Sequence, residues 1–185
     1  MRQPEEYSSL EDSLNSEFWQ DVAIDSQISN AVIMMVDDEP ILMELLQAFL
    51  EEQGYKNFIT IEDSTKAIAA MLEYQPDILL LDLKMPNLGG LDIIQLMRSN
   101  SRLKRLPIIV LTSSTDSETK IKALELGATD FLAKPVDASE LALRLRNTLT
   151  VKAYQDQLAY NDSLTGLLNR NRFLERLEWA IKNAS

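Results

Sequence analysis

The chain has 185 residues, and its hydrophobic fraction of 45% is ordinary for a protein that buries an apolar core. It contains neither cysteine nor histidine, which excludes disulfides, thiolate nucleophiles and zinc sites built from these residues. The net charge of −11, with no basic face, argues against a nucleic-acid partner, and no apolar run approaches the roughly 18 residues that span a membrane.

Residues 1–30 read as an acidic N-terminal extension, with seven acidic residues and one basic residue. Apolar side chains recur there at every fourth position, at Leu10, Leu14, Phe18 and Val22. That spacing is typical of one stripe on a helix. Two interpretations remain open, a flexible extension and a docking helix. The N-terminus shows no signal-peptide pattern, and together with the lack of cysteine this favours a cytoplasmic location.

From residue 31 onward, short apolar runs alternate with helical patterns. Strands are predicted within 31–38, 58–61, 77–83, 107–112 and 129–133. Helices are predicted within 39–54, 64–74, 90–99, 117–127 and 137–160. The central strands are continuously apolar, which is typical of a parallel sheet covered on both faces. We therefore predict an α/β fold, a doubly wound five-stranded parallel sheet with an extended C-terminal helix.

The last predicted helix is longer than a domain of this kind requires. No Gly or Pro interrupts the sequence from Asp137 to Tyr160, so the helix would be about 36 Å long. Its first half carries Leu141, Leu145 and Leu149, and its second half carries Val151, Tyr154 and Leu158 at coiled-coil spacing. We predict a domain over 31–150 and a helical stalk over 151–160, which either pairs with a second copy or frays.

Polar residues follow four of the predicted strands. Asp37 and Asp38 end the first strand, Asp82 the third and Thr112 the fourth, and Lys134 follows the fifth. Parallel sheets place their sites beyond the carboxyl ends of their strands. With the strand order 2-1-3-4-5, the three acids would crowd into one pocket. A hard divalent cation such as Mg²⁺ would relieve their repulsion.

Asp82 is the best candidate nucleophile, because it is central and follows a rigid, buried strand. With Mg²⁺ bound, its carboxylate could attack a phosphorus atom without repulsion from the phosphoryl oxygens. Lys134 would pair first with Asp82 and then with the added phosphoryl group. The Thr112 hydroxyl could donate to a phosphoryl oxygen.

Four stretches, "MMVDDEP", "ILLLDLKMPNLGGLD", "IIVLTSS" and "GATDFLAKP", resemble the receiver domain of bacterial two-component response regulators, which has a flavodoxin-like fold. The resemblance implies that Asp82 accepts the phosphoryl group. It implies that Mg²⁺ is held by Asp37, Asp38, Asp82 and the backbone carbonyl of Lys84. It also implies a switch made by Thr112 and Phe131, with Lys134 beside the phosphate and a cis Lys134–Pro135 bond.

The resemblance also implies partners. In this family the phosphoryl group comes from a phosphohistidine, which a chain without histidine cannot supply. A histidine kinase or phosphotransfer protein is therefore expected as donor. Phosphorylation would lead to a homodimer through the face formed by the fourth helix, fifth strand and fifth helix, and through the stalk.

The C-terminal stretch "NDSLTGLLNRNRF", residues 161–173, resembles the opening of GGDEF-type diguanylate cyclase domains. On this resemblance, residues 161–185 begin an incomplete GGDEF domain. The chain would then be the front of a longer protein that makes cyclic di-GMP, and would not itself be a competent cyclase. The alternative is a C-terminal amphipathic helix with the stripe Leu174, Leu177 and Ile181.

Two other functions are alternatives to the phosphorylated switch. The first is a stand-alone or degenerate receiver that acts as an interaction module, against which the complete acceptor set argues. The second is a phosphatase with an aspartyl-phosphate intermediate. Such enzymes resemble D-x-D after a strand, whereas position 84 of this chain is lysine.

Overall fold

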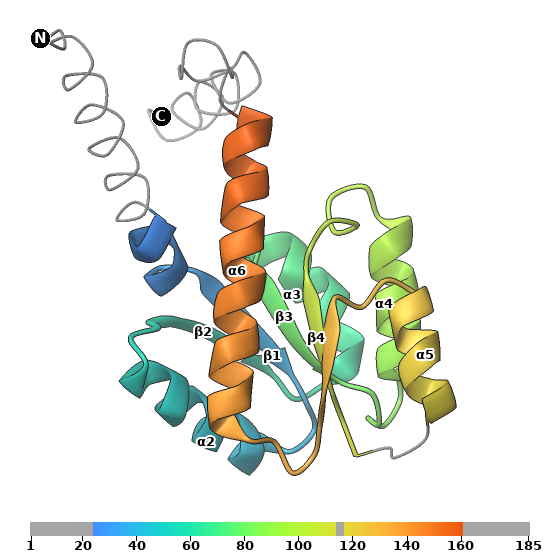
Figure 1. The fold of residues 1–185 in the computed structure, drawn as a ribbon. Helices are drawn as coiled ribbons and strands as arrows, with labels where there is room; N and C mark the ends of the chain where they lie inside the picture. Colours follow the sequence, from blue (N-terminus) through green and yellow to red (C-terminus); the bar gives the residue numbers. More distant parts are fainter. Residues whose placement is uncertain (1–23, 114–116, 161–185) are drawn as a thin grey trace, which may run out of the picture.

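A computed structural model describes residues 24–113 and 117–160 of the chain. Its centre is one sheet of five parallel strands in the order β2-β1-β3-β4-β5 (Figure 1). The strands are β1 (Val32–Val36), β2 (Asn57–Ile61), β3 (Ile78–Asp82), β4 (Ile108–Thr112) and β5 (Asp130–Ala133). The predicted fold class and strand order are confirmed.

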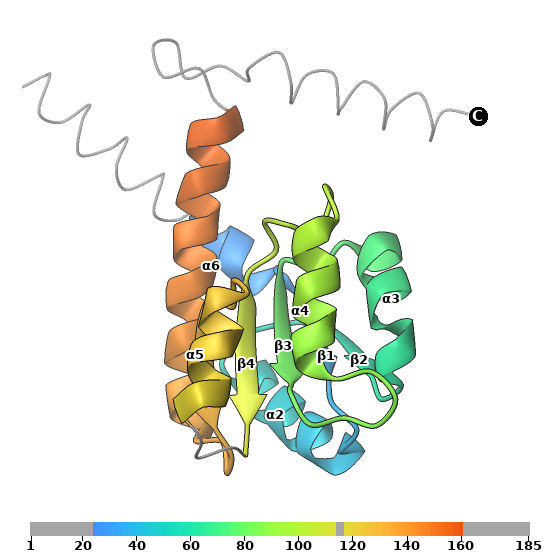
Figure 2. The same ribbon diagram turned by 90° about the vertical axis from the view of Figure 1, so that its right-hand side faces the viewer.

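Helices cover both faces of the sheet. They are α2 (Pro40–Glu52), α3 (Ala67–Tyr74), α4 (Gly90–Ser99), α5 (Ser117–Glu125) and α6 (Ala138–Tyr160). A short 3-10 turn, Ser64–Lys66, precedes α3, and residues 24–29 are also helical. The 24–29 helix, α2 and α6 pack on one face, and α3, α4 and α5 pack on the other (Figures 1 and 2). The fold is therefore a three-layer α/β/α arrangement.

The central strands supply most of the core. All five residues of β3 and all five of β4 are buried, and their side chains alternate between the two helical layers. A strand covered on both faces has no solvent side, which is why its sequence is apolar without alternation. Edge strand β2 is only half-buried, and its sequence mixes Asn57 and Thr60 with apolar residues.

Helix α6 is continuous from the sheet into the predicted stalk. Leu141, Leu145 and Leu149 are buried, whereas Val151 is 55% and Tyr154 46% exposed. Asp137 caps the helix, because its Oδ1 accepts a hydrogen bond of 2.9 Å from the backbone N–H of Glu140. The first half of α6 thus packs on its own domain as predicted. Pairing of the second half with another copy stays a prediction.

No helix in the described part of the chain is both long and apolar enough to cross a lipid bilayer. The stripe formed by Leu10, Leu14, Phe18 and Val22 lies outside the described residues, as does the motif at 161–173. The interpretations placed on these two segments therefore stay predictions.

Candidate functional site

Three carboxylates meet at the carboxyl ends of β1 and β3. Val36 pairs with Leu81 in adjacent strands, so the residues that follow, Asp37 and Asp82, leave the sheet side by side. One oxygen from each of Asp37, Asp38 and Asp82 lies within 4.8 Å of the other two. Asp37 and Asp82 are buried, whereas Asp38 is exposed. We call these three acids, with Lys134, the acidic site.

Lys134 reaches the acids from the end of β5. Its Nζ lies 2.8 Å from Asp37 Oδ2, 3.1 Å from Asp82 Oδ1 and 2.9 Å from Glu39 Oε1. The Lys134–Pro135 peptide bond is cis, as predicted. The backbone N–H of Lys134 donates to the Thr112 carbonyl at 2.8 Å, which joins the end of β4 to this lysine. Glu39 is not among the predicted site residues; it directly follows the two acids in the sequence, but no local pattern links it to Lys134, 95 positions away.

Burial and charge act in opposite directions in the acidic site. Burial raises the pKa of Asp37, and its contacts with Lys134 and the Glu39 backbone N–H offset this only in part. Burial by itself would lower the pKa of Lys134. Its hydrogen bonds to Asp37, Glu39 and Asp82 outweigh burial, so the pKa of Lys134 lies above its usual value. The ammonium group therefore stays charged at neutral pH and is the cation that holds the buried carboxylates together.

The donor set fits a hard divalent cation. Asp37 Oδ2 is buried, and its ion pair with Lys134 is the only contact found for it within the described residues. Asp38 offers an exposed carboxylate beside it. Carboxylate and backbone oxygens suit Mg²⁺, which often keeps several waters and binds through one or two carboxylates. Asp37, Asp38 and Asp82 are the residues that would hold it.

The remaining predicted residues surround the acids. The Lys84 backbone N–H donates to Asp82 Oδ2 at 2.7 Å and so fixes this carboxylate. Metal binding by the Lys84 carbonyl stays a prediction. Thr112 is buried at the end of β4, one residue beyond the partner of Asp82. Phe131 is half-buried on β5, with Lys120 Nζ 5.1 Å from its ring centroid. The switch roles of Thr112 and Phe131 stay predictions.

Gly90 at the start of α4 sets the position of Asp82. A Cβ at Gly90 would lie 2.3 Å from the Asp82 carbonyl oxygen and 2.8 Å from the Leu83 Cα. We expect Gly90→Ala to lower the free energy of unfolding by about 1–3 kcal/mol, because the helix must move off the end of β3. Urea denaturation measures this. Gly89→Ala is the matched control, since its Cβ would meet the Asp92 side chain only at 3.4 Å. Equal losses in the two variants would contradict the close packing.

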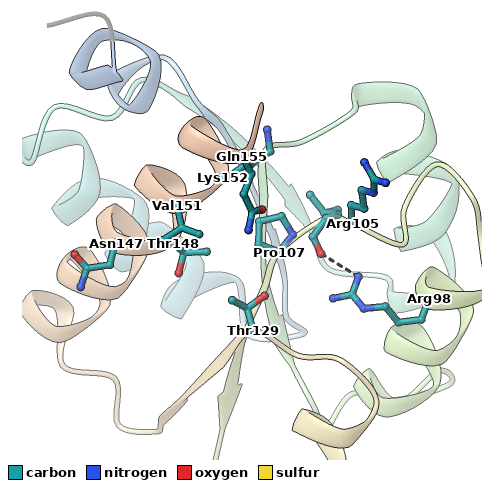
Figure 3. A pocket seen from close by; sticks show the side chains of 10 residues that line it. Arg98, Arg105, Pro107, Thr129, Asn147, Thr148, Val151, Lys152 and Gln155 are labelled. Atoms are coloured by element: carbon teal, nitrogen blue, oxygen red, sulfur yellow. Dashed lines mark hydrogen bonds between the residues drawn. The ribbon is translucent and has the colours of Figure 1, made fainter. Parts of the chain in front are cut away.

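A second hollow, of about 380 Å³, lies at the opposite ends of the strands (Figure 3). It is bounded by α6 and by Pro107 and Thr129, which precede β4 and β5. Arg98 lines it but donates to the carbonyls of Gly127 at 3.2 Å and Leu106 at 3.0 Å. This arginine therefore ties α4 to neighbouring loops, and the hollow is separate from the acidic site.

Comparison with known proteins identifies the family and agrees with the fold. The family model "Response regulator receiver domain" matches residues 33–146. The DNA-binding response regulator MtrA of Mycolicibacterium smegmatis is 38% identical over 117 residues, which are 63% of this chain and 50% of MtrA. The chain thus spans about half the length of the curated relatives it matches.

Two solved structures are similar to this chain. A response regulator from Chloroflexus aurantiacus is 32% identical with a TM-score of 0.61, covering 65% of this chain and 98% of that one. The receiver domain of the sensor histidine kinase PA1611 from Pseudomonas aeruginosa has magnesium coordinated in its active-site cleft. It is 28% identical with a TM-score of 0.59, covering 65% and 98%. The family match runs from β1 into α6 and includes every residue of the acidic site. This chain therefore belongs to the response regulator receiver domain family.

Proposed function

We propose that the chain is the phospho-accepting receiver of a two-component response regulator, and that Asp82 takes up the phosphoryl group in the presence of Mg²⁺. The observation that carries this proposal is the sharing of one ammonium group by two buried carboxylates. Lys134 lies within 3.1 Å of both Asp37 and Asp82, beside the exposed carboxylate of Asp38. A structural ion pair needs only one acid for each lysine. Here three carboxylates surround one ammonium group, and a divalent cation would offset the remaining negative charge.

The chemistry follows from the positions of these groups. Mg²⁺, when bound, would neutralise the carboxylates and the phosphoryl oxygens. A carboxylate oxygen of Asp82 forms a bond to phosphorus while the P–N bond of the donor phosphohistidine breaks and neutral imidazole leaves once protonated. The Lys84 N–H holds Asp82 Oδ2 during this step. Lys134, already 3.1 Å from Asp82 Oδ1, is within reach of the new phosphoryl group.

An exposed apolar pair beside the acidic site supports docking of the phosphodonor. Ile41 is 72% and Leu45 64% exposed, one turn apart on α2. The helix begins directly after Glu39, which contacts Lys134. Apolar side chains exposed at i and i+4 are suited to packing against a partner helix. We propose that a histidine kinase or phosphotransfer protein docks there and presents its phosphohistidine to Asp82.

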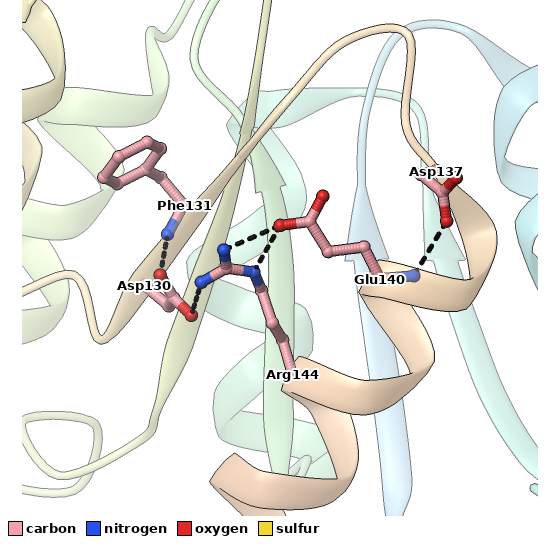
Figure 4. Close-up of polar contacts among 5 residues, drawn as sticks. All are labelled: Asp130, Phe131, Asp137, Glu140 and Arg144. Atoms are coloured by element: carbon pink, nitrogen blue, oxygen red, sulfur yellow. Dashed lines mark hydrogen bonds and ion pairs between the residues drawn. The ribbon is translucent and has the colours of Figure 1, made fainter.

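The face formed by α5, β5 and α6 supports the proposed homodimer. Arg144 on α6 bridges Asp130 and Glu140, and Asp130 also accepts a hydrogen bond of 2.8 Å from the Phe131 backbone N–H (Figure 4). The predicted switch residue is thus linked to the stalk helix through one acid and one arginine. On α5, Ile121 is 56% exposed. A two-fold pairing would bury such side chains and exchange these ion pairs between copies.

The output is proposed to be a diguanylate cyclase, supported by the motif at 161–173 and by the unbroken run of α6 to Tyr160. Paired stalks would bring two such domains together. A DNA-binding output is the second candidate, because relatives such as MtrA are named DNA-binding regulators. The sequence predicts no nucleic-acid partner. The names of these relatives do not support that prediction for the whole protein. Production of cyclic di-GMP from GTP by the protein that contains this chain would decide between the two outputs.

Metal removal tests the proposed reaction. We expect ³²P-acetyl phosphate to label the chain in the presence of Mg²⁺, with the alkali lability of an acyl phosphate. Excess EDTA should reduce labelling to background, because the acids then repel the phosphoryl oxygens. Labelling that is unaffected by EDTA would rule out the metal-dependent mechanism. Absence of both Mg²⁺ binding and labelling favours the interaction module, and rapid turnover of a phosphomonoester favours the phosphatase.

A further inference from the structure

The 24–29 helix packs on the second half of α6, and most of this contact lies outside the family match at 33–146. Ile24 is 4% and Ile28 7% exposed, and both belong to the same core cluster as Leu149 and Ala153. Ala153 lies in the predicted stalk, residues 151–160, yet it is 2% exposed within its own chain. The N-terminal segment therefore covers the place where α6 leaves the sheet (Figure 1).

Polar contacts fix the same junction. Lys152 Nζ lies 2.9 Å from Asp77 Oδ1, and Asp77 Oδ2 accepts a hydrogen bond of 2.9 Å from the Val32 backbone N–H. Asp77 thus joins α6 to the first residue of β1, directly after the N-terminal helix. Asp25 and Arg146 approach to 3.3 Å, but both are mostly exposed, so this pair adds little.

The contact between the N-terminal helix and α6 is closely packed and is not an open groove. The hollow between the N-terminal helix and α6 is only about 10 Å³, which is at the lower limit for holding one water molecule. It is bounded on one side by Gln27 and Ile28 and on the other by Leu149, Lys152 and Ala153. The two helices therefore pack closely here, with little free space between them.

A helix that projects beyond its domain is marginally stable unless a second surface supports it. On α6, Val151 and Tyr154 face solvent, so the support at this level comes from the side that carries Leu149 and Ala153. We infer that residues 24–30 are a clamp that holds the second half of α6 and fixes the direction in which the stalk leaves the receiver. The N-terminal extension then acts on the stalk at a point remote from the acidic site. A partner that displaces the clamp would loosen the stalk without touching Asp82.

Amide hydrogen exchange of the full chain tests the clamp. In the double variant Ile24→Asp, Ile28→Asp, exchange in peptides covering residues 147–156 should become at least about tenfold faster, because local opening of α6 no longer breaks apolar contacts. Exchange in β3 should be unchanged. The matched control is Ser26→Asp, Ser29→Asp, which adds the same two charges to the same helix at positions that do not line its contact with α6. It should leave the exchange of α6 as in the wild type.

Three outcomes would overturn the inference. Wild-type exchange of 147–156 in the double variant would show that α6 needs no clamp. Equal acceleration in β3 and α6 would show that the helix serves the whole core and not the stalk. Equal acceleration in the control would make the effect one of charge. Ile28→Ala keeps the experiment informative if the double variant fails to fold, since it should give a smaller acceleration confined to the same peptides. The test does not depend on phosphorylation of Asp82.

Discussion

Replacing Asp82 by asparagine should abolish phosphoryl uptake from acetyl phosphate and Mg²⁺. The amide has the size of the carboxylate but is a far weaker nucleophile, and it carries no charge for the cation or for Lys134. Asp82 lies at the end of a fully buried strand, which holds its carboxylate in one position. Labelling with ³²P-acetyl phosphate, quantified against total protein, measures the loss.

The matched control for this variant is Asp92→Asn. Asp92 is exposed in the first turn of α4, on the element that packs against the end of β3. It should accept neither metal nor phosphate, and its variant should be labelled as the wild type is. Equal incorporation in the wild type and Asp82→Asn would refute Asp82 as the acceptor, and loss of labelling in Asp92→Asn would point to a site elsewhere.

Replacing Lys134 by methionine should lower the free energy of unfolding by about 3–5 kcal/mol in metal-free buffer. Removing one partner of a buried ion pair leaves uncompensated charge, and here two carboxylates lose their cation together. The Lys134 side chain is 12% exposed and those of Asp37 and Asp82 are 2% and 4% exposed, so solvent screens the pairs only weakly. Urea denaturation in the presence of EDTA measures the change.

Mg²⁺ should distinguish loss of charge from loss of packing in this variant. We expect Mg²⁺ to raise the stability of Lys134→Met more than that of the wild type, because in the variant the cation meets acids with no competing ammonium group. Lys56→Met is the control, since Lys56 is exposed and directly precedes β2, at the opposite ends of the strands from the site. A variant with wild-type stability, or one that Mg²⁺ does not rescue, would argue against the shared cation.

The sequence was sufficient for the sheet because each strand is a short apolar run bounded by turn residues. The acids were found by their place after those runs, since a parallel sheet brings its carboxyl ends together. The contact of Glu39 with Lys134 was missed. It joins residues 95 positions apart, and no local pattern reports such a distance. The close approach of Gly90 to Asp82 likewise appears only when helix and strand are packed.

The N-terminal extension was the least predictable part. Both a flexible segment and a docking helix were compatible with residues 1–30, because a polar, acidic sequence with a thin apolar stripe suits either. The described end of this segment, residues 24–29, is helical and buried on one side. Two isoleucines one turn apart give too short a pattern to indicate a partner surface. The surface that the two isoleucines contact lies on α6, more than 100 residues later in the sequence, at Leu149 and Ala153.

The direction of α6 determines how a chemical change at the acidic site can affect the far end of this helix, near Tyr160. The helix starts just after Lys134 and Pro135, beside the acids, and runs back past the sheet to the opposite pole. It is supported part of the way along its length by Ile24 and Ile28. The first half of the helix is packed on the sheet through Leu141 and Leu145, so its near end can shift only if this packing shifts with it. Because the helix is continuous, such a shift would be transmitted along its length to the end that projects beyond the support.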